Sequence, residues 1–178
     1  MKLQTILRHI AGYCVGFSIF VVGIPSGLYL ASIELDRYLP INLIPIDKLR
    51  VGISLLIGII GIVFAVWSNL YLLFVGKGGP ADGFGVTISP RMQHLVTSGP
   101  YRYTRHPMAF GALSGYLALA LFLNSPICLA IVTGFLAAMA IYLKLVEEKR
   151  LLVDFGDSYQ RYRNTVSMLV PFPSKKKK

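Results

Sequence analysis

Charged and apolar positions divide this chain into long uncharged segments separated by shorter polar ones. No residue with a fixed charge lies within 9–33, and further uncharged apolar segments cover 51–75 and 106–143. About 20 consecutive apolar residues are enough to cross a bilayer as a helix. The pattern therefore predicts an integral membrane protein of the all-α class.

The last apolar segment is too long for one crossing and is interrupted near its middle. Asn124, Ser125 and Pro126 stand there, and such residues are typical of a tight turn. We therefore predict that this segment forms a helical hairpin. The chain as a whole is then expected to have about four transmembrane helices, near residues 10–33, 51–75, 108–123 and 127–146.

Two features modify this simple helical pattern. Gly23, Pro25 and Gly27 are expected to kink the first span, which membrane helices tolerate. After Glu147, apolar residues recur every three or four positions among charged ones, and Gly156 stands where a bend is expected. This periodicity predicts a C-terminal amphipathic helix at the membrane interface. Its apolar side would face lipid or the helix bundle, and it is formed by Leu152, Phe155, Tyr159, Tyr162 and Val166.

Composition agrees with a membrane protein and favours lipids over nucleic acid as its partners. Hydrophobic residues make up 54% of the 178, and the formal net charge is +10. Because the basic residues flank apolar segments, they suit anionic lipid headgroups better than nucleic acid. The length suits one domain, 1–178. Neither the two cysteines nor His9, His94 and His106 have the spacing of a metal site.

The distribution of lysine and arginine predicts the orientation in the membrane. Basic residues precede the first span, occupy the polar segment 77–105 and follow the fourth span, whereas the hairpin turn at Asn124 has none. The positive-inside rule then places both termini and the segment 77–105 in the cytoplasm. The membrane would be the plasma membrane in a prokaryote and the endoplasmic reticulum in a eukaryote.

Two polar clusters at span ends are candidates for chemistry. Arg105, His106 and Pro107 precede the third span, and Glu147 and Glu148 end the fourth. Because the open ends of a hairpin lie side by side, the clusters should be neighbours. Adjacent glutamates point about 100° apart on a helix, so only one is expected to face a pocket there. Alternatively, the arginines anchor a helix end and the glutamates form surface ion pairs.

These clusters belong to a longer motif. Residues 95–107, LVTSGPYRYTRHP, resemble a signature of the isoprenylcysteine carboxyl methyltransferase and phospholipid methyltransferase superfamily. The glutamate pair with the following Phe155-Gly156, Tyr159 and Tyr162 is also similar to that family. The resemblance implies S-adenosylmethionine as cofactor, held by residues 93–111 and 144–163. It also implies an amphiphilic or lipid substrate that enters from the bilayer and offers a carboxylate, thiol or amine to the methyl group.

The resemblance also implies which residues form the site. Those with a chemical role would be Arg105, His106, Glu147 and Glu148. Those in contact with the cofactor would be Leu95, Val96, Gly99, Tyr101, His106, Pro107, Glu147 and Glu148. The sequence departs from the family pattern at Ala109, where tyrosine is usual, at Ser167, where proline is usual, and before the glutamate pair, where Lys144 stands in place of arginines. These departures weaken a specific assignment to prenylcysteine.

Two other functions fit parts of the pattern. Some membrane sterol reductases carry a similar His-Pro turn and use NADPH, but they usually have more spans, and the cofactor's phosphates would require more basic residues. A non-catalytic membrane scaffold with an inherited motif is the second alternative. Cofactor binding distinguishes all three functions.

Overall fold

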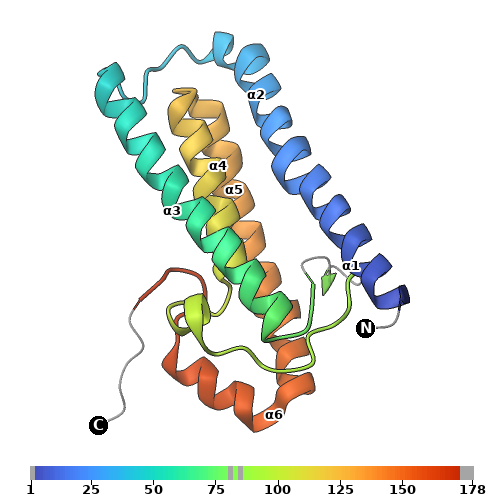
Figure 1. The fold of residues 1–178 in the computed structure, drawn as a ribbon. Coiled ribbons are helices and arrows are strands. Elements are labelled where there is room, and N and C mark those ends of the chain that lie inside the picture. Colours follow the sequence, from blue (N-terminus) through green and yellow to red (C-terminus); the bar gives the residue numbers. More distant parts are fainter. Residues whose placement is uncertain (1–2, 80–81, 84–85, 173–178) are drawn as a thin grey trace.

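Helices form nearly all of the chain in a computed structural model, which describes residues 3–79, 82–83 and 86–172 (Figure 1). In chain order the helical elements are α1 (Leu3–Gly16), η1 (Phe17–Gly23), α2 (Ile24–Leu35), η2 (Asp36–Tyr38), α3 (Asp47–Phe74), η3 (Gly99–Arg102), α4 (Pro107–Phe122), α5 (Pro126–Tyr142), η4 (Leu143–Glu147) and α6 (Glu148–Thr165). The prediction of a helical fold is confirmed. The structure also contains one small feature that was not predicted, an antiparallel pair of two-residue strands, β1 (Asp82–Gly83) and β2 (Val86–Thr87).

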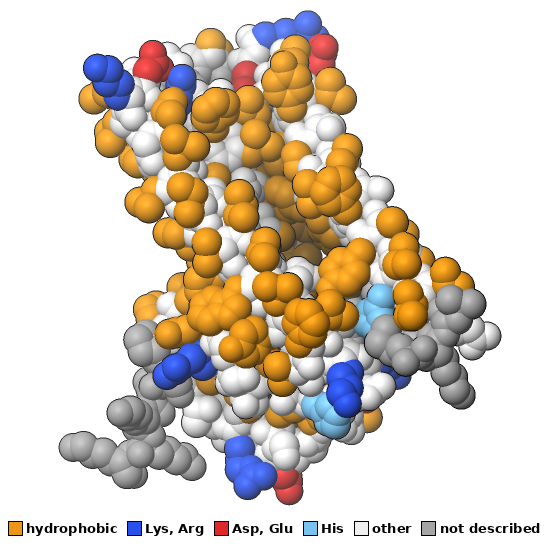
Figure 2. All heavy atoms as spheres, in the orientation of Figure 1, with side chains coloured by type: hydrophobic (Ala, Val, Ile, Leu, Met, Phe, Trp, Pro, Cys, Tyr) orange, Lys and Arg blue, Asp and Glu red, His pale blue; other side chains and the backbone are white. Residues whose placement is uncertain are grey.

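The predicted membrane helices are present close to their expected bounds. Three continuous helical stretches are long and apolar enough to cross a bilayer, namely Ile6–Tyr38, Asp47–Phe74 and Pro126–Thr165. The fourth apolar helix, α4, has 16 residues and extends about 24 Å, less than a hydrocarbon core of about 30 Å. Charged side chains gather at the two ends of the molecule, and apolar ones cover the middle (Figure 2). The chain is therefore an integral membrane protein.

The first span contains a π-helix where a kink was expected. Residues Phe17–Gly23 form η1, and the Ile24 N–H bonds to the Ile19 carbonyl five residues back. Pro25, which follows directly, cannot donate a hydrogen bond and would clash with a carbonyl one turn earlier in a regular α-helix. The wider π turn accommodates this break within a continuous helix.

The closest helix contact joins α3 and α4 through glycines. A Cβ atom on Gly111 would lie 2.6 Å from the Ala65 nitrogen, and one on Gly61 would lie 2.8 Å from the Gly111 oxygen. Small residues let two membrane helices approach closely, and packing then holds them together. At the other end of α4 the predicted turn is present, with Asn124 at a φ of 54° and the Ser125 hydroxyl capping α5.

The first span is attached to the rest of the protein near both of its ends. Near α2, Ser125 Oγ donates to Asp36 Oδ1 at 2.9 Å. Near the N-terminus, Arg8 Nε donates to the Ile88 carbonyl at 3.2 Å. At the level of η1, Tyr116 Oη of α4 donates to the Phe20 carbonyl at 2.9 Å. From there toward the N-terminus α1 diverges from α4 and α5 in the ribbon (Figure 1), and the space-filling view shows a hollow lined by apolar side chains (Figure 2).

The C-terminal helix continues directly from α5 through the π-helix η4. It bends at Gly156, whose φ of 52° and ψ of −131° are not helical, as the sequence predicted. Its buried side packs on the polar segment before α4 and includes Leu151, Tyr159, Tyr162 and Val166. Leu152 was expected on that side but is 37% exposed, whereas Leu151 is 8% exposed. The non-helical Gly156 lies between Leu152 and Tyr159 and therefore shifts the helical phase that a regular repeat predicts.

Candidate active site

A cavity of about 950 Å³ lies between the first span, α3, the α4–α5 hairpin and α6. Its membrane part is apolar and includes Phe17, Phe20, Leu119, Phe135 and Met139. Its end near α6 is polar and includes Tyr101, Arg105, His106, Glu147 and Tyr159. The cavity thus joins a polar chamber to a space that is chemically similar to lipid tails.

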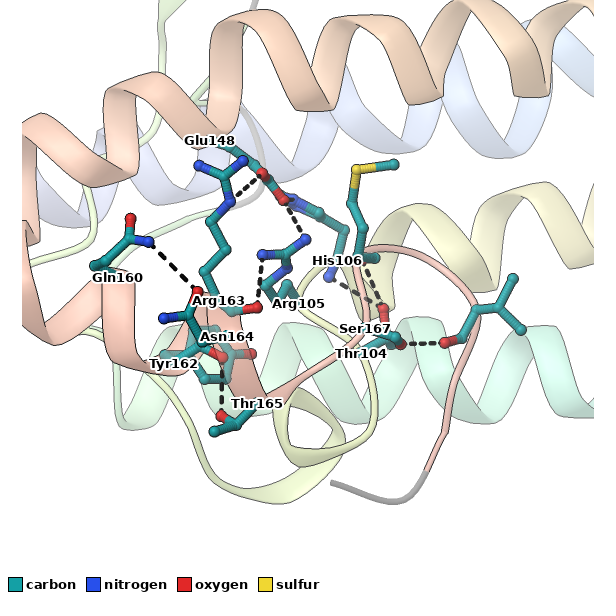
Figure 3. A network of polar contacts seen from close by, with 12 residues as sticks. Thr104, Arg105, His106, Glu148, Gln160, Tyr162, Arg163, Asn164, Thr165 and Ser167 are labelled. Carbon is teal, nitrogen blue, oxygen red and sulfur yellow. Dashed lines mark hydrogen bonds and ion pairs between the residues drawn. The ribbon is translucent and has the colours of Figure 1, made fainter. Parts of the chain in front are cut away.

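Main-chain hydrogen bonds from the C-terminal segment hold Arg105 and His106 at this polar end. The Arg105 N–H donates to the Ser167 carbonyl at 2.9 Å, and the His106 N–H donates to the Met168 carbonyl at 3.2 Å. Thr104 Oγ1 donates to the same Met168 carbonyl at 2.9 Å. Pro107 then begins α4, a position where its missing N–H costs nothing. The residues after α6 therefore fix the start of α4 (Figure 3).

Glu148 is the buried centre of a charged cluster (Figure 3). Its side chain is 2% exposed, and its oxygens lie 2.7 Å from Arg105 Nη2 and 3.2 Å from Arg163 Nε. His106 Nε2 lies 3.8 Å from Glu148 Oε1. Burial alone would raise the pKa of this carboxyl, but His106, Arg105 and Arg163 together hold the pKa below its ordinary value. The charges of α6 exclude it from the hydrocarbon, so this cluster lies beyond the spanning part of the helix.

The two adjacent glutamates have different surroundings. Glu147 lines the cavity, and its Oε1 lies 2.6 Å from Arg150 Nη2. Glu148 is not among the residues described as lining the cavity and lies behind Arg105 and His106. The π-helix η4 ends at Glu147, the first residue of the pair, and sets the direction of both side chains. Glu147 is therefore accessible from the cavity, whereas Glu148 contacts two of the residues that line it.

Several polar atoms at the cavity have no hydrogen-bond partner within the described part of the chain. They are Asn69 Oδ1, Arg105 Nε, His106 Nε2 and Tyr159 Oη, and all four residues line the cavity. Buried polar groups are nearly always hydrogen-bonded, because an unmade bond in a poorly hydrated site costs free energy. This grouping fits a cavity that receives a ligand carrying polar groups of its own.

Most residues that the sequence motif implied meet at this cavity. Those lining it are Leu95, Val96, Tyr101, Arg105, His106, Pro107 and Glu147. Gly99 instead packs on Tyr71, where an added Cβ would lie 2.5 Å from the ring, and its φ of 59° favours glycine. Glu148 lies behind the wall. The hairpin argument that placed His106 close to the glutamate pair is confirmed by geometry.

Sequence analysis missed four contributors to this region. The sequence pattern assigns no role in the site to Arg163, Arg150 or Asn69, and it marks Ser167 only as a departure from a motif. Pairing of Arg163 with Glu148 depends on the Gly156 bend, and the sequence predicted the bend but not its direction. Asn69 could have been identified from the sequence, since an amide within a spanning helix is costly and often functional.

Within the described residues, no group of three or more His, Cys, Asp or Glu is arranged to hold a metal.

Comparison with known proteins adds to this geometry. Residues 49–158 match the model of the family described as phospholipid methyltransferase. Over 106 residues the chain is 32% identical to methanethiol S-methyltransferase of Mycobacterium tuberculosis (strain ATCC 25618 / H37Rv), covering 59% of this chain and 37% of that protein. Over 76 residues it is 36% identical to methanethiol S-methyltransferase of Crocosphaera subtropica (strain ATCC 51142 / BH68), covering 43% of this chain and 29% of that protein. The chain thus spans about a third of the length of these relatives.

A solved structure shares the fold. The eukaryotic intramembrane Ras methyltransferase ICMT (isoprenylcysteine carboxyl methyltransferase) aligns with a TM-score of 0.56 and 21% sequence identity, over 89% of this chain and 53% of that one. At this identity the likeness concerns the arrangement of helices. The family match, in contrast, extends over more than half of the chain and contains both polar clusters. This protein therefore belongs to the phospholipid methyltransferase family, as its motifs predicted.

Proposed function

We propose that this protein is a membrane methyltransferase that uses S-adenosylmethionine, with both termini and the polar end of the cavity on the cytoplasmic side. The observation that carries the proposal is the cavity itself, in which Arg105, His106 and Glu147 stand at the end of an apolar space. Such a cavity admits a polar cofactor and a substrate with an apolar part side by side. Family membership and the excess of basic residues near that end support the same function and orientation.

The residues of the polar end fit the cofactor's charged groups. Arg105 Nε suits its carboxylate, and Glu147 suits its ammonium group or its cationic sulfonium. Leu95, Val96 and Pro107 would form the adjoining apolar wall. When bound, the cofactor supplies an electrophilic methyl group, so the reaction requires no metal. Glu148 keeps Arg105 and His106 in place from behind.

The protein's contribution to the reaction would be position and the exclusion of water. Holding two reactants in line within a closed site replaces much of the entropic cost of their encounter. His106 is the candidate base, because it lines the cavity and Glu148 Oε1, 3.8 Å from its Nε2, would stabilise the imidazolium that forms. A thiol or amine acceptor must lose a proton, which His106 would take, whereas a carboxylate acceptor requires no base.

Among acceptors we favour a thiol with an apolar part. Two relatives are methanethiol S-methyltransferases by name, and much of the cavity lining is apolar. A prenylcysteine carboxylate is less suited, since Leu143, Leu145 and Val146 stand before the glutamate pair and leave only Lys144 basic there. The family match does not favour a sterol-type reductase. A non-catalytic scaffold would not explain why several buried polar atoms at the cavity have no hydrogen-bond partner among the described residues.

The test is methyl transfer by the protein reconstituted in lipid vesicles. Radiolabelled S-adenosylmethionine is supplied with methanethiol, a long-chain alkanethiol, a prenylcysteine or phosphatidylethanolamine in separate reactions. We expect label to enter a thiol, and to fall at least tenfold with Glu147→Gln. Label in prenylcysteine or phosphatidylethanolamine alone would overturn the thiol assignment, and label in none of the four would contradict the proposed activity toward these acceptor classes.

A further inference from the structure

Asn69 is a polar side chain on the wall that α3 contributes to the cavity. Gly61, Ala65, Asn69 and Leu72 follow one another at steps of three or four, and all four line the cavity. Asn69 Nδ2 donates to the Ala65 carbonyl at 2.8 Å, within its own helix. Asn69 Oδ1 is buried and has no partner in the part of the chain that the structure describes.

This arrangement leaves the acceptor oxygen of the amide buried without a hydrogen bond to any described residue. An amide carries two donor hydrogens and an acceptor oxygen, and burial of the oxygen without a bond costs free energy. Because Nδ2 is engaged by the helix backbone, the orientation of the side chain is fixed. Asn69 therefore offers the cavity a neutral hydrogen-bond acceptor inside an otherwise apolar helix.

The position of Asn69 along the cavity follows from the contact between α3 and α4. These helices run in opposite directions (Figure 1) and meet where a Cβ on Gly111 would touch the Ala65 nitrogen. One turn further along α3 corresponds to one turn back along α4, so Asn69 is level with Pro107. On its other side Leu72 and Val96 both line the cavity, and a Cβ on Gly76 would lie 2.9 Å from the Leu72 carbonyl oxygen and 3.0 Å from Val96 Cγ2.

Asn69 thus lies between the His106-Pro107 turn and the apolar wall that contains Val96. We propose that Asn69 Oδ1 accepts a hydrogen bond from a neutral N–H or O–H group on the nucleoside part of the bound cofactor. The charged groups of S-adenosylmethionine match Arg105 and Glu147, whereas an uncharged acceptor matches the adenine amino group or a ribose hydroxyl. The apolar Leu72 and Val96 suit the flat face of a purine. This inference rests on the proposed use of S-adenosylmethionine.

The test is binding of S-adenosylhomocysteine, measured by calorimetry on detergent-purified protein with no methyl acceptor present. Asn69→Leu keeps a similar volume and removes the acceptor oxygen, and Asn69→Ala is measured beside it in case either variant fails to fold. Ser68→Ala is the matched control. Ser68 also donates to the Ala65 carbonyl, at 3.0 Å, but it is fully buried and is not among the residues that line the cavity.

We expect both Asn69 variants to bind about tenfold more weakly, as for the loss of one buried hydrogen bond, and Ser68→Ala to bind as the wild type does. Unchanged binding by a folded Asn69 variant would overturn this inference while leaving the proposed function intact. Equal weakening by Ser68→Ala would also overturn it, because the effect would then come from the helix. Failure of the wild type to bind would instead overturn the proposed function, and this inference with it.

Discussion

At the scale of single residues, the adjacent glutamates show how one motif provides two different roles. Glu148 is enclosed by Arg105 and Arg163, whereas Glu147 lines the cavity beside Arg150. Removal of one partner from a buried ion pair leaves the other charge uncompensated, which is far more costly than loss of a partly exposed pair. Substitutions at the two positions should therefore be distinguishable.

We expect Glu148→Gln to lower the free energy of unfolding by about 3 kcal/mol, because Arg105 would remain buried without its counter-charge. Glu147→Gln should unfold close to the wild-type temperature and bind S-adenosylmethionine at least tenfold more weakly. Thermal unfolding in detergent and calorimetry measure the two effects. The division of roles would be contradicted if the two variants exchanged these properties.

Acidification provides a second test of Glu148. The folded protein holds the pKa of this carboxyl below its ordinary value of 4.5, so the unfolded chain takes up the proton first as the pH falls. The stability that Glu148 contributes is thus complete above pH 4.5 and is lost as the pH falls through the lower pKa of the folded state. We expect the difference in unfolding temperature between the wild type and Glu148→Gln to narrow below pH 4.5. A constant difference would show that the lowered pKa is not a source of stability.

The sequence predicted the two residue clusters but not their detailed roles. Arg105 and His106 stood out because they end a loop and precede a proline, and hairpin geometry placed the glutamates beside them. The choice between Glu147 and Glu148 depends on the π-helix η4, since its extra residue changes the direction of every later side chain. Likewise, the partner Arg163 is brought back to Glu148 only by the bend at Gly156.

At the scale of elements, the cavity depends on the contact between α3 and α4. Both helices contribute walls, and the glycines of this contact set their separation. The apolar pattern predicted both helices within a few residues. It did not predict the π-helix η1, because the sequence shows that Pro25 must disturb the helix but not how the helix accommodates it.

We expect Gly111→Ala to destabilise the protein by about 1–3 kcal/mol, since the new Cβ would meet the Ala65 nitrogen and the Gly61 oxygen, which cannot move aside as side chains do. Gly134→Ala on α5 is the matched control, because a Cβ there meets nothing within 4 Å. Unfolding temperatures of the two variants should therefore differ by several degrees. Equal temperatures would show that the helices separate at little cost.

At the scale of the whole molecule, the cavity exists because the first span packs on the α4–α5 hairpin through its second half, as far as Phe20, contacts the protein again near its N-terminus, and diverges between these regions. Asp36 and Arg8 mark these two attachments, with the polar chamber nearer to Arg8. The sequence predicted the number of apolar helices and the clustering of charge. It could not predict the gap, since a helix with apolar residues on every side is equally compatible with lipid and with protein neighbours.

The proposed orientation places the polar chamber on the cytoplasmic side. In a variant with Cys14 and Cys128 replaced by alanine, we introduce Lys48→Cys or Gln93→Cys, both at exposed positions outside the apolar segments. On intact cells a membrane-impermeant maleimide should label Cys at position 48 and reach position 93 only after permeabilisation. The opposite labelling pattern would show that the topology is the inverse of the predicted one.

The central claim is that the cavity binds S-adenosylmethionine, and calorimetry on the detergent-purified protein tests it most directly. S-adenosylmethionine and NADPH are titrated separately into the wild type, His106→Ala and Glu147→Ala. Our account predicts saturable binding of S-adenosylmethionine by the wild type, at least tenfold weaker binding by both variants, and no binding of NADPH. Folded wild-type protein that binds NADPH instead, or neither compound, would contradict it.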